Sequence, residues 1–285
     1  MKTLTYKLFL PVLLLYNVAS FAQKPIELSL GTIKTALKDG AIDIGIKYLR
    51  SLDSTFKEQD ILLAQHNSLF QATPEINIQT GTADAFSAIN VKMQGLWMFF
   101  PTTTVAGQVT PNTAGLMHCI PVSVGLETNN KFNILNGIIE AGYVPWYQSA
   151  MMSSVPAWIK HTKVGVFLQS GYKFALDKTG NDAIGGQTDE SGEKPDNAIF
   201  RAKGSFAIDT KSLFELYGIG VGLVGSTDGW YDFLNKQVYY TIEGKFRLYL
   251  TSAKEQYLDF KYQKGSGAPN FNEGDQFGLG LTVRF

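Results

Sequence analysis

The sequence has few of the residues from which disulfide frameworks, metal centres and nucleic-acid surfaces are built. Cys119 is the only cysteine, which excludes an intrachain disulfide and a CxxC-type zinc site. The three histidines, His66, His118 and His161, are too few for a multi-histidine metal centre. The 25 basic residues equal the 25 acidic residues in number, so net charge does not favour a nucleic-acid partner. We therefore expect no metal, no cofactor and no nucleic acid.

Proline is also scarce, with 10 residues, whereas aromatic residues and glycine are frequent. The chain of 285 residues contains 19 Phe, 13 Tyr, 4 Trp and 28 Gly. Aromatic side chains favour strands and glycine interrupts helices, so this composition is typical of a sheet-rich protein rather than a helical bundle. The sequence shows no internal repeat and no sign of a second domain.

The first 22 residues have the pattern of a cleaved secretory signal peptide. Lys2 and Lys7 precede an apolar stretch over 8–18, and the small residue Ala22 suits cleavage before Gln23. The alternative, a membrane anchor, is disfavoured because the apolar stretch is too short to span a bilayer as a helix. No later run of about 18 apolar residues occurs, so we expect no transmembrane helix in the mature chain.

The rest of the chain alternates between apolar and polar residues with a period of two. Around Glu243 and Arg247, for example, the apolar residues Ile242, Phe246 and Leu248 occupy alternate positions. An amphipathic helix would instead place its apolar residues three and four apart. The pattern therefore predicts strands that have one apolar face and one polar face.

In several segments the alternation continues for ten to fourteen residues, and this length distinguishes two kinds of β protein. Strands of soluble proteins are usually about five or six residues long. A tilted strand needs about 9–11 residues to cross a bilayer, and closure into a barrel leaves no unpaired sheet edge in the hydrocarbon. We therefore expect an all-β fold, a transmembrane antiparallel up-and-down β-barrel.

The C-terminal segment supports this interpretation. Its apolar residues fall on alternate positions and the last residue is aromatic: Phe277, Leu279, Leu281, Val283 and Phe285. The segment resembles the C-terminal strand of bacterial outer-membrane β-barrel proteins, which commonly ends in Phe. The resemblance implies that these five residues form an assembly signal read by the barrel-assembly machinery. It also implies that the protein lies in the outer membrane of a Gram-negative cell.

The expected strands number about twelve, within a range of 10 to 14. They are 40–49, 75–81, 85–98, 116–126, 131–146, 198–208, 213–224, 236–250, 255–263 and 275–285, together with the long stretch 158–178. Four short connections, around 82–84, 127–130, 209–212 and 252–254, all lie on the periplasmic side only if 158–178 is split at 169–171. The split raises the count from eleven to twelve. The alternative is one long hairpin arm at 158–178 that protrudes from the membrane, with ten strands in total if 40–49 is not a barrel strand either.

The chain then divides into a signal peptide (1–22), an N-terminal periplasmic segment (23–39) and the barrel (40–285). The longer connections expected outside the cell are 50–74, 99–115, 147–157, 179–197, 225–235 and 264–274. Thr55 and Glu58 have capping-box spacing, which predicts a short helix near 56–70. Trp97, Trp146, Trp158 and Trp230 fall near strand ends, as the residues of aromatic girdles do.

If the apolar faces contact lipid, the alternate positions face the lumen. The charged candidates for the lumen are Lys163, Lys173, Arg201, Lys203, Lys245, Arg247, Lys261 and Arg284, with Glu140, Glu243 and Asp259. Eight basic and three acidic residues give an excess of five positive charges, which favours anions. The alternative is that these groups neutralise one another and fill a narrow lumen.

Three functions follow from this fold. The leading hypothesis is a channel or small-solute transporter that prefers anions, and the second is a non-conducting structural barrel in an assembly or secretion complex. The third is a lipid hydrolase, because the spacing of His66 and Ser68 resembles that of the outer-membrane phospholipases. The glycine and arginine expected after the serine are missing, so we expect no catalytic residue. The expected partners are outer-membrane lipid, the barrel-assembly machinery, a small solute and other envelope proteins.

Overall fold

The computed structural model describes residues 26–35, 41–49, 68–80, 88–99, 102–105, 108–111, 116–129, 132, 134–147, 162–175, 197–210, 213–251, 255–268, 271 and 273–284. The predicted signal peptide over 1–22 lies outside these residues. Within the described ranges, no helix is long and apolar enough to cross a membrane.

The described part of the chain is built from strands. They are β1 (Ile26–Thr35), β2 (Ala41–Leu49), β3 (Ser68–Thr80), β4 (Ala88–Phe99), β5 (Thr102–Val105), β6 (Gln108–Pro111), β7 (Leu116–Thr128), β8 (Ile134–Tyr147), β9 (Thr162–Ala175), β10 (Asn197–Asp209), β11 (Phe214–Leu216), β12 (Ile219–Asp232), β13 (Gln237–Tyr249), β14 (Gln256–Ser266) and β15 (Glu273–Arg284).

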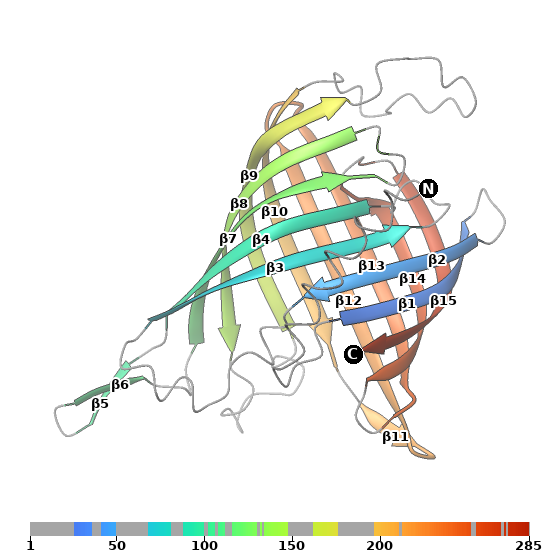
Figure 1. Cartoon of the computed structure of the whole chain (residues 1–285). Helices are drawn as coiled ribbons and strands as arrows, with labels where there is room; N and C mark the ends of the chain where they lie inside the picture. The colour runs from blue at the N-terminus through green and yellow to red at the C-terminus, as the bar shows by residue number, and fades with distance from the viewer. Residues whose placement is uncertain are drawn as a thin grey trace, which may run out of the picture.

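Twelve of these strands form a closed antiparallel barrel (Figure 1). Each barrel strand pairs with the barrel strands before and after it in the chain, and β1 pairs with β15 to close the ring. The short strand β11 pairs with β12 at one rim, and β5 and β6 form a separate two-stranded sheet. The predicted fold class, an antiparallel barrel of about twelve strands, is confirmed.

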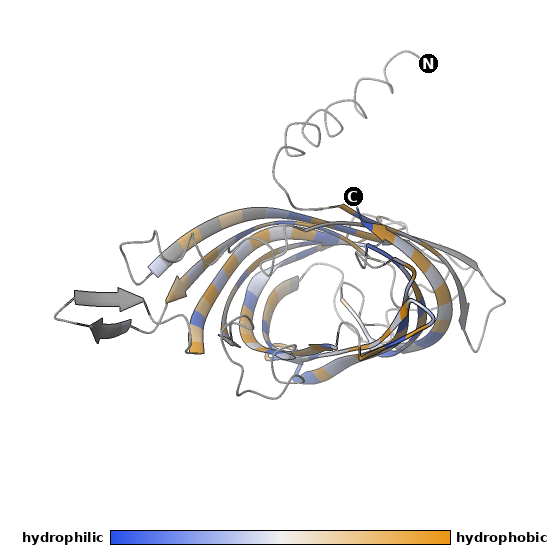
Figure 2. Ribbon diagram, turned by 90° about the horizontal axis from the view of Figure 1, so that it is seen from below, coloured by the Kyte–Doolittle hydropathy of each residue, from blue (hydrophilic) through white to orange (hydrophobic). Residues whose placement is uncertain are grey.

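The outer face of the barrel is apolar. Leu30, Val124, Ile139 and Val166 are each exposed over 58–60% of their surface, and the strands alternate between hydrophobic and hydrophilic residues (Figure 2). A soluble monomer rarely exposes large contiguous apolar patches, whereas a membrane barrel presents such a band to lipid. The architecture is therefore that of an outer-membrane β-barrel.

The twelve strands are not the twelve expected from the sequence. The split of 158–178 was wrong, because β9 runs without a break through 169–171 to Ala175. Gly171 marks a close approach to β8 rather than a turn: a Cβ atom there would lie 2.0 Å from the carbonyl oxygen of Gly137. The strand that completes the count is β1, which lies in the segment expected to be periplasmic (23–39). Its pairing with β15 covers an edge that would otherwise be open.

The four short connections do not lie on one side of the membrane. We call the end of the barrel where β1 starts and β15 ends the terminal rim, and the other end the opposite rim. The connections over 81–87 and 129–133 lie at the opposite rim, whereas those over 210–218 and 250–255 lie at the terminal rim. The prediction was wrong because β9 is a single strand, so three strands separate 129–133 from 210–218. The longer connections likewise occur at both rims.

Several expected loops are partly strand. β3 starts at Ser68, so the last residues of the helix predicted over 56–70 are extended, while 56–67 lie outside the described residues. Residues 225–232, predicted as loop, belong to β12, whose glycines and polar residues hide the alternation. A tight turn follows, in which the Asp232 Oδ1 atom accepts hydrogen bonds from the backbone N–H groups of Leu234 and Asn235.

Candidate functional site

The predicted charged residues take three kinds of position on the wall. Lys173, Arg201, Arg247 and Asp259 are buried; Glu140, Lys203, Glu243, Lys245, Lys261 and Arg284 are partly buried; and Lys163, at the start of β9, is exposed. Their neighbours along the strands, such as Val164, Phe200 and Phe246, are exposed on the outer face. The pleat thus gives each strand an inner polar face and an outer apolar one.

Arg247 is held by a carboxylate and an aromatic ring. Its Nε and Nη2 atoms donate to the two carboxylate oxygens of Asp259 on β14, at 2.7 and 2.8 Å. Its guanidinium carbon lies 3.8 Å from the centroid of the Tyr257 ring. Gly222, directly across on β12, has no side chain to compete for this space. Such a bidentate, ring-covered arginine is fixed in place.

A second arginine is fixed at the opposite rim. The Nε atom of Arg201 donates to Asp232 Oδ2 at 3.1 Å, and the guanidinium lies 4.4 Å from the centroid of Phe271. Phe271, in the connection between β14 and β15, is only 5% exposed and packs on Trp230 and Tyr239. This small aromatic cluster is inside the barrel. Trp230 is therefore not part of an outer aromatic girdle, whereas Trp97 is 42% exposed on the outer face.

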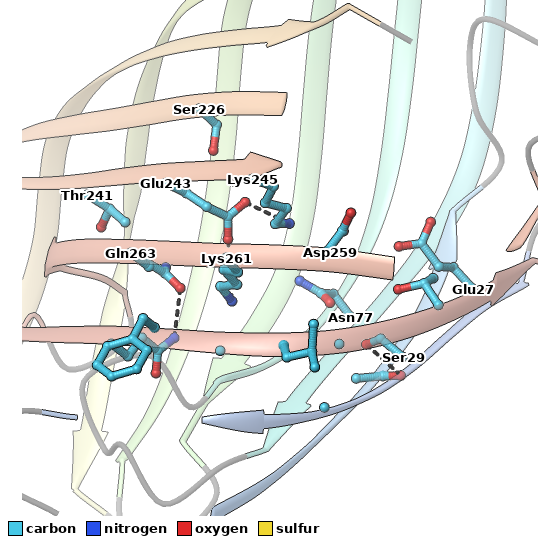
Figure 3. A pocket seen from close by; sticks show the side chains of 18 of the residues that line it. Glu27, Ser29, Asn77, Ser226, Thr241, Glu243, Lys245, Asp259, Lys261 and Gln263 are labelled. Carbon is cyan, nitrogen blue, oxygen red and sulfur yellow. Dashed lines mark hydrogen bonds and ion pairs between the residues drawn. The ribbon is translucent and has the colours of Figure 1, made fainter. Parts of the chain in front are cut away.

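The lysines of β13 and β14 share one carboxylate. Glu243 lies 2.8 Å from the Lys245 Nζ atom and 3.4 Å from the Lys261 Nζ atom (Figure 3). Nearer the terminal rim, the Arg284 Nε atom donates to Glu27 Oε2 at 2.9 Å, and this pair joins the first barrel strand to the last.

Among the described residues, and apart from Asp209 at the terminal rim, sequence reasoning missed six charged residues of the inner face. They are Glu27, Glu75, Lys92, Glu127, Asp228 and Asp232. Lys92 could have been found, since it lies between Val91 and Met93, which both point outward. Glu27 lies on β1, which was not predicted as a strand. The predicted strands ended before Glu127, Asp228 and Asp232, and one of them began at Glu75.

With these residues included, the expected positive excess is not found. Apart from Lys163 and Asp209 at the terminal rim, the described inner face carries eight basic and eight acidic side chains. The basic ones are Lys92, Lys173, Arg201, Lys203, Lys245, Arg247, Lys261 and Arg284. The acidic ones are Glu27, Glu75, Glu127, Glu140, Asp228, Asp232, Glu243 and Asp259.

Two adjoining cavities lie inside the barrel. The first, of about 420 Å³, extends from Glu27 at the terminal rim along β13 and β14 (Figure 3). The second, of about 350 Å³, lies nearer the opposite rim and is lined mainly by strands β3, β4, β7, β8 and β9 and by Trp230. Asn77, Asp228, Thr241 and Gln263 line both cavities, so the two meet at a polar boundary.

No catalytic or metal site emerges from the described residues. His66 lies outside them, and its suggested partner Ser68 is the first residue of β3. The Nδ1 atom of His118 is 2.7 Å from the hydroxyl oxygen of Tyr143, and both residues are exposed on the outer face. The described side chains form no group of three or more metal-ligating residues.

The residues of the predicted assembly signal lie on β15. Phe277, Leu279 and Leu281 are exposed on the outer face, and Val283 is partly exposed. Phe285 lies outside the described residues. The role of this strand in assembly stays a prediction.

No protein-family model and no curated protein matches the sequence. Among solved structures, the chain is similar to the NanC porin, with 9% identity, coverage of 91% of this chain and 100% of the porin, and a TM-score of 0.40. It is also similar to outer membrane phospholipase A from Escherichia coli (10% identity, 93% and 92% covered, TM-score 0.45). A third similar structure is the translocator domain of the autotransporter NalP from Neisseria meningitidis (9% identity, 99% and 96% covered, TM-score 0.34). By name these are a porin, a phospholipase and a translocator.

Proposed function

We propose that this barrel is a channel for small polar solutes across the outer membrane. The observation that carries the proposal is the pair of adjoining cavities inside the ring, lined by charged and polar side chains. Small barrels fill their interior with side chains, and wider ones leave room for ligands or channels. A polar lining offers a solute the hydrogen bonds that it loses on leaving water.

We propose no general anion preference for this channel. That preference depended on five unbalanced positive charges, whereas the described inner face has equal numbers of basic and acidic groups. Arg201 and Arg247 also form ion pairs with Asp232 and Asp259, respectively, and each guanidinium lies against an aromatic ring.

Conductance of the purified protein in planar bilayers tests the proposal. Discrete current steps in potassium chloride, and swelling of proteoliposomes in a small sugar, are the expected results. Folded protein that inserts but neither conducts nor admits the sugar would contradict the proposal.

The second candidate is a non-conducting structural barrel. The ring-covered arginine pairs and the inward-packed Phe271 favour it, because such contacts stiffen a wall and narrow its interior. The expected result in that case is an envelope protein that copurifies from detergent-solubilised membranes, together with an absence of conductance.

A further inference from the structure

The second cavity has more negative charge than its ion pairs neutralise. Lys92 Nζ lies 3.0 Å from Glu75 Oε2, and Lys203 Nζ lies 3.6 Å from Asp228 Oδ1, so these four residues balance. Glu127 and Glu140 also line the cavity, and neither forms an ion pair with any residue that the structure describes. Glu140 accepts a hydrogen bond from the neutral amide of Gln169 at 2.7 Å. The cavity therefore carries two uncompensated carboxylates.

Other basic groups are close but already engaged. Lys92 and Lys203 lie within electrostatic range of Glu127, as does Arg201. Each of the three has its own carboxylate: Glu75, Asp228 and Asp232 respectively. None of them therefore removes the excess.

The same region contains buried polar atoms without hydrogen-bond partners. Asn90, Glu127 and Asn136 are direct neighbours across β4, β7 and β8. The Oδ1 atom of Asn90 and the Oε2 atom of Glu127 are buried and have no hydrogen-bond partner among the described residues. Asn136 is 0% exposed, and neither atom of its side-chain amide has a partner there. Buried polar groups are nearly always satisfied, so three such neighbours in one row indicate a missing partner.

We propose that the second cavity binds a small solute carrying a primary ammonium group, with Glu127, Glu140 and Asn90 as its acceptors. An ammonium group brings a positive charge for the two carboxylates and N–H donors for the unpartnered oxygen atoms of Asn90 and Glu127. The cavity already accommodates such groups: Lys92 pairs with Glu75 and lies within electrostatic range of Glu127 and Glu140, and the Lys203 ammonium lies 5.4 Å from the Trp230 ring centroid. This inference rests on the proposed channel only in that the solute enters through the lumen.

The probe that tests the site is 1,4-diaminobutane, and its matched control is 1,4-butanediol, which has the same carbon chain and no charge. Purified full-length protein is examined in planar bilayers and by titration calorimetry in detergent. The diamine should bind and reduce the potassium current, and the diol should do neither. Glu140→Gln should weaken diamine binding about tenfold, because one charge-assisted hydrogen bond is lost.

Two further variants test whether the effect of Glu140→Gln is specific to the second cavity. Glu215→Gln makes the same chemical change on the exposed strand β11, outside both cavities, and should leave diamine binding unchanged. Asn90→Asp adds a third uncompensated negative charge to the cavity, beside Glu127 and Glu140, and should strengthen binding. Folding of each variant is checked by the gel mobility of unboiled protein, and if Glu140→Gln does not fold, Asn90→Asp decides alone.

The outcomes separate this inference from the channel proposal. Diamine binding without any conductance would leave the ammonium site standing and remove the channel. Conductance without diamine binding, or equal effects of diamine and diol, would overturn the ammonium site and leave the channel. A loss of affinity that is equal in Glu140→Gln and Glu215→Gln, or no gain in Asn90→Asp, would also overturn it.

Discussion

Arg247 and Asp259 are at most 7% exposed, and this burial makes each dependent on the other. Arg247→Met should destabilise the barrel by about 3–5 kcal/mol, because it leaves the Asp259 carboxylate buried without a partner. The free energy of unfolding in urea, measured in detergent micelles, provides the test. Lys264→Met removes a charge from an exposed position on the next strand and should cost less than about 1 kcal/mol. An equal loss of unfolding free energy in the two variants would show that the buried pair contributes no more to stability than an exposed charge.

Ile139 tests the outer face at the same scale. It is 58% exposed in the middle region of β8, where the surface is apolar. Ile139→Arg should cost about 2–4 kcal/mol if its position is near the bilayer midplane, because the guanidinium would then lie in hydrocarbon. The yield of folded, heat-modifiable protein in lipid vesicles measures this cost. Ile139→Leu serves as the control, and a harmless arginine would mean that the face assignment is reversed.

The facing of single residues could largely be read from the sequence, but their partners could not. Alternation alone separates Arg247 from Phe246, because successive side chains of a strand point to opposite faces. The pairing of Arg201 with Asp232 joins residues 31 apart in the sequence and depends on the register between β10 and β12. Glu127 was missed because the predicted strand ended one residue before it, although β7 continues to Thr128.

Among the elements, β9 shows how glycine can mislead sequence reasoning. The sequence Gln169-Ser170-Gly171 has the composition of a turn, yet these residues lie within β9. Gly171 has no side chain, and this lets the backbone of β8 come close to β9. Gly171→Ala should therefore weaken the pairing of β8 with β9 by about 1–3 kcal/mol, the usual cost of overpacking. Thermal unfolding followed by circular dichroism is the measurement. Gly204→Ala is the matched control on β10, because a Cβ atom there would meet nothing within 4 Å.

The C-terminal strand carries a prediction about assembly. Because this strand resembles the terminal strand of outer-membrane barrels, Phe285→Asp should lower the amount of barrel found in the outer membrane. Immunoblots of fractionated membranes compare it with Phe285→Tyr, which keeps an aromatic end. Refolding of both purified variants in detergent should be similar, since the assembly signal acts through the cellular machinery. Unchanged membrane levels of Phe285→Asp would contradict an assembly role.

For the whole molecule, the sequence predicted the class of fold and the strand number, but the number was right for a wrong reason. Splitting β9 added one strand and omitting β1 removed another, so the two errors cancelled. The alternation in β1 is short and breaks at Thr32 and Ile33, whereas its pairing with β15 depends on closure, which no local pattern reveals. The net charge of the described inner face was mispredicted mainly for a different reason. Four of the five missing acidic residues lie where a predicted strand began or ended early, and only Glu27 lies on β1.

The pairing of β1 with β15 closes the ring, and we call it the seam. It also has a consequence for how the molecule folds. Glu27 and Arg284 form a contact across 257 positions of the chain, while the other sheet neighbours are joined by much shorter connections. Bringing such distant segments together carries a large loop-closure entropy, and contacts of this kind form slowly. We therefore infer that the seam is the last part of the ring to form, after an open curved sheet has been assembled. Until then β1 and β15 are both unpaired edges, and the nearly finished molecule is at its most vulnerable to pairing with a neighbour.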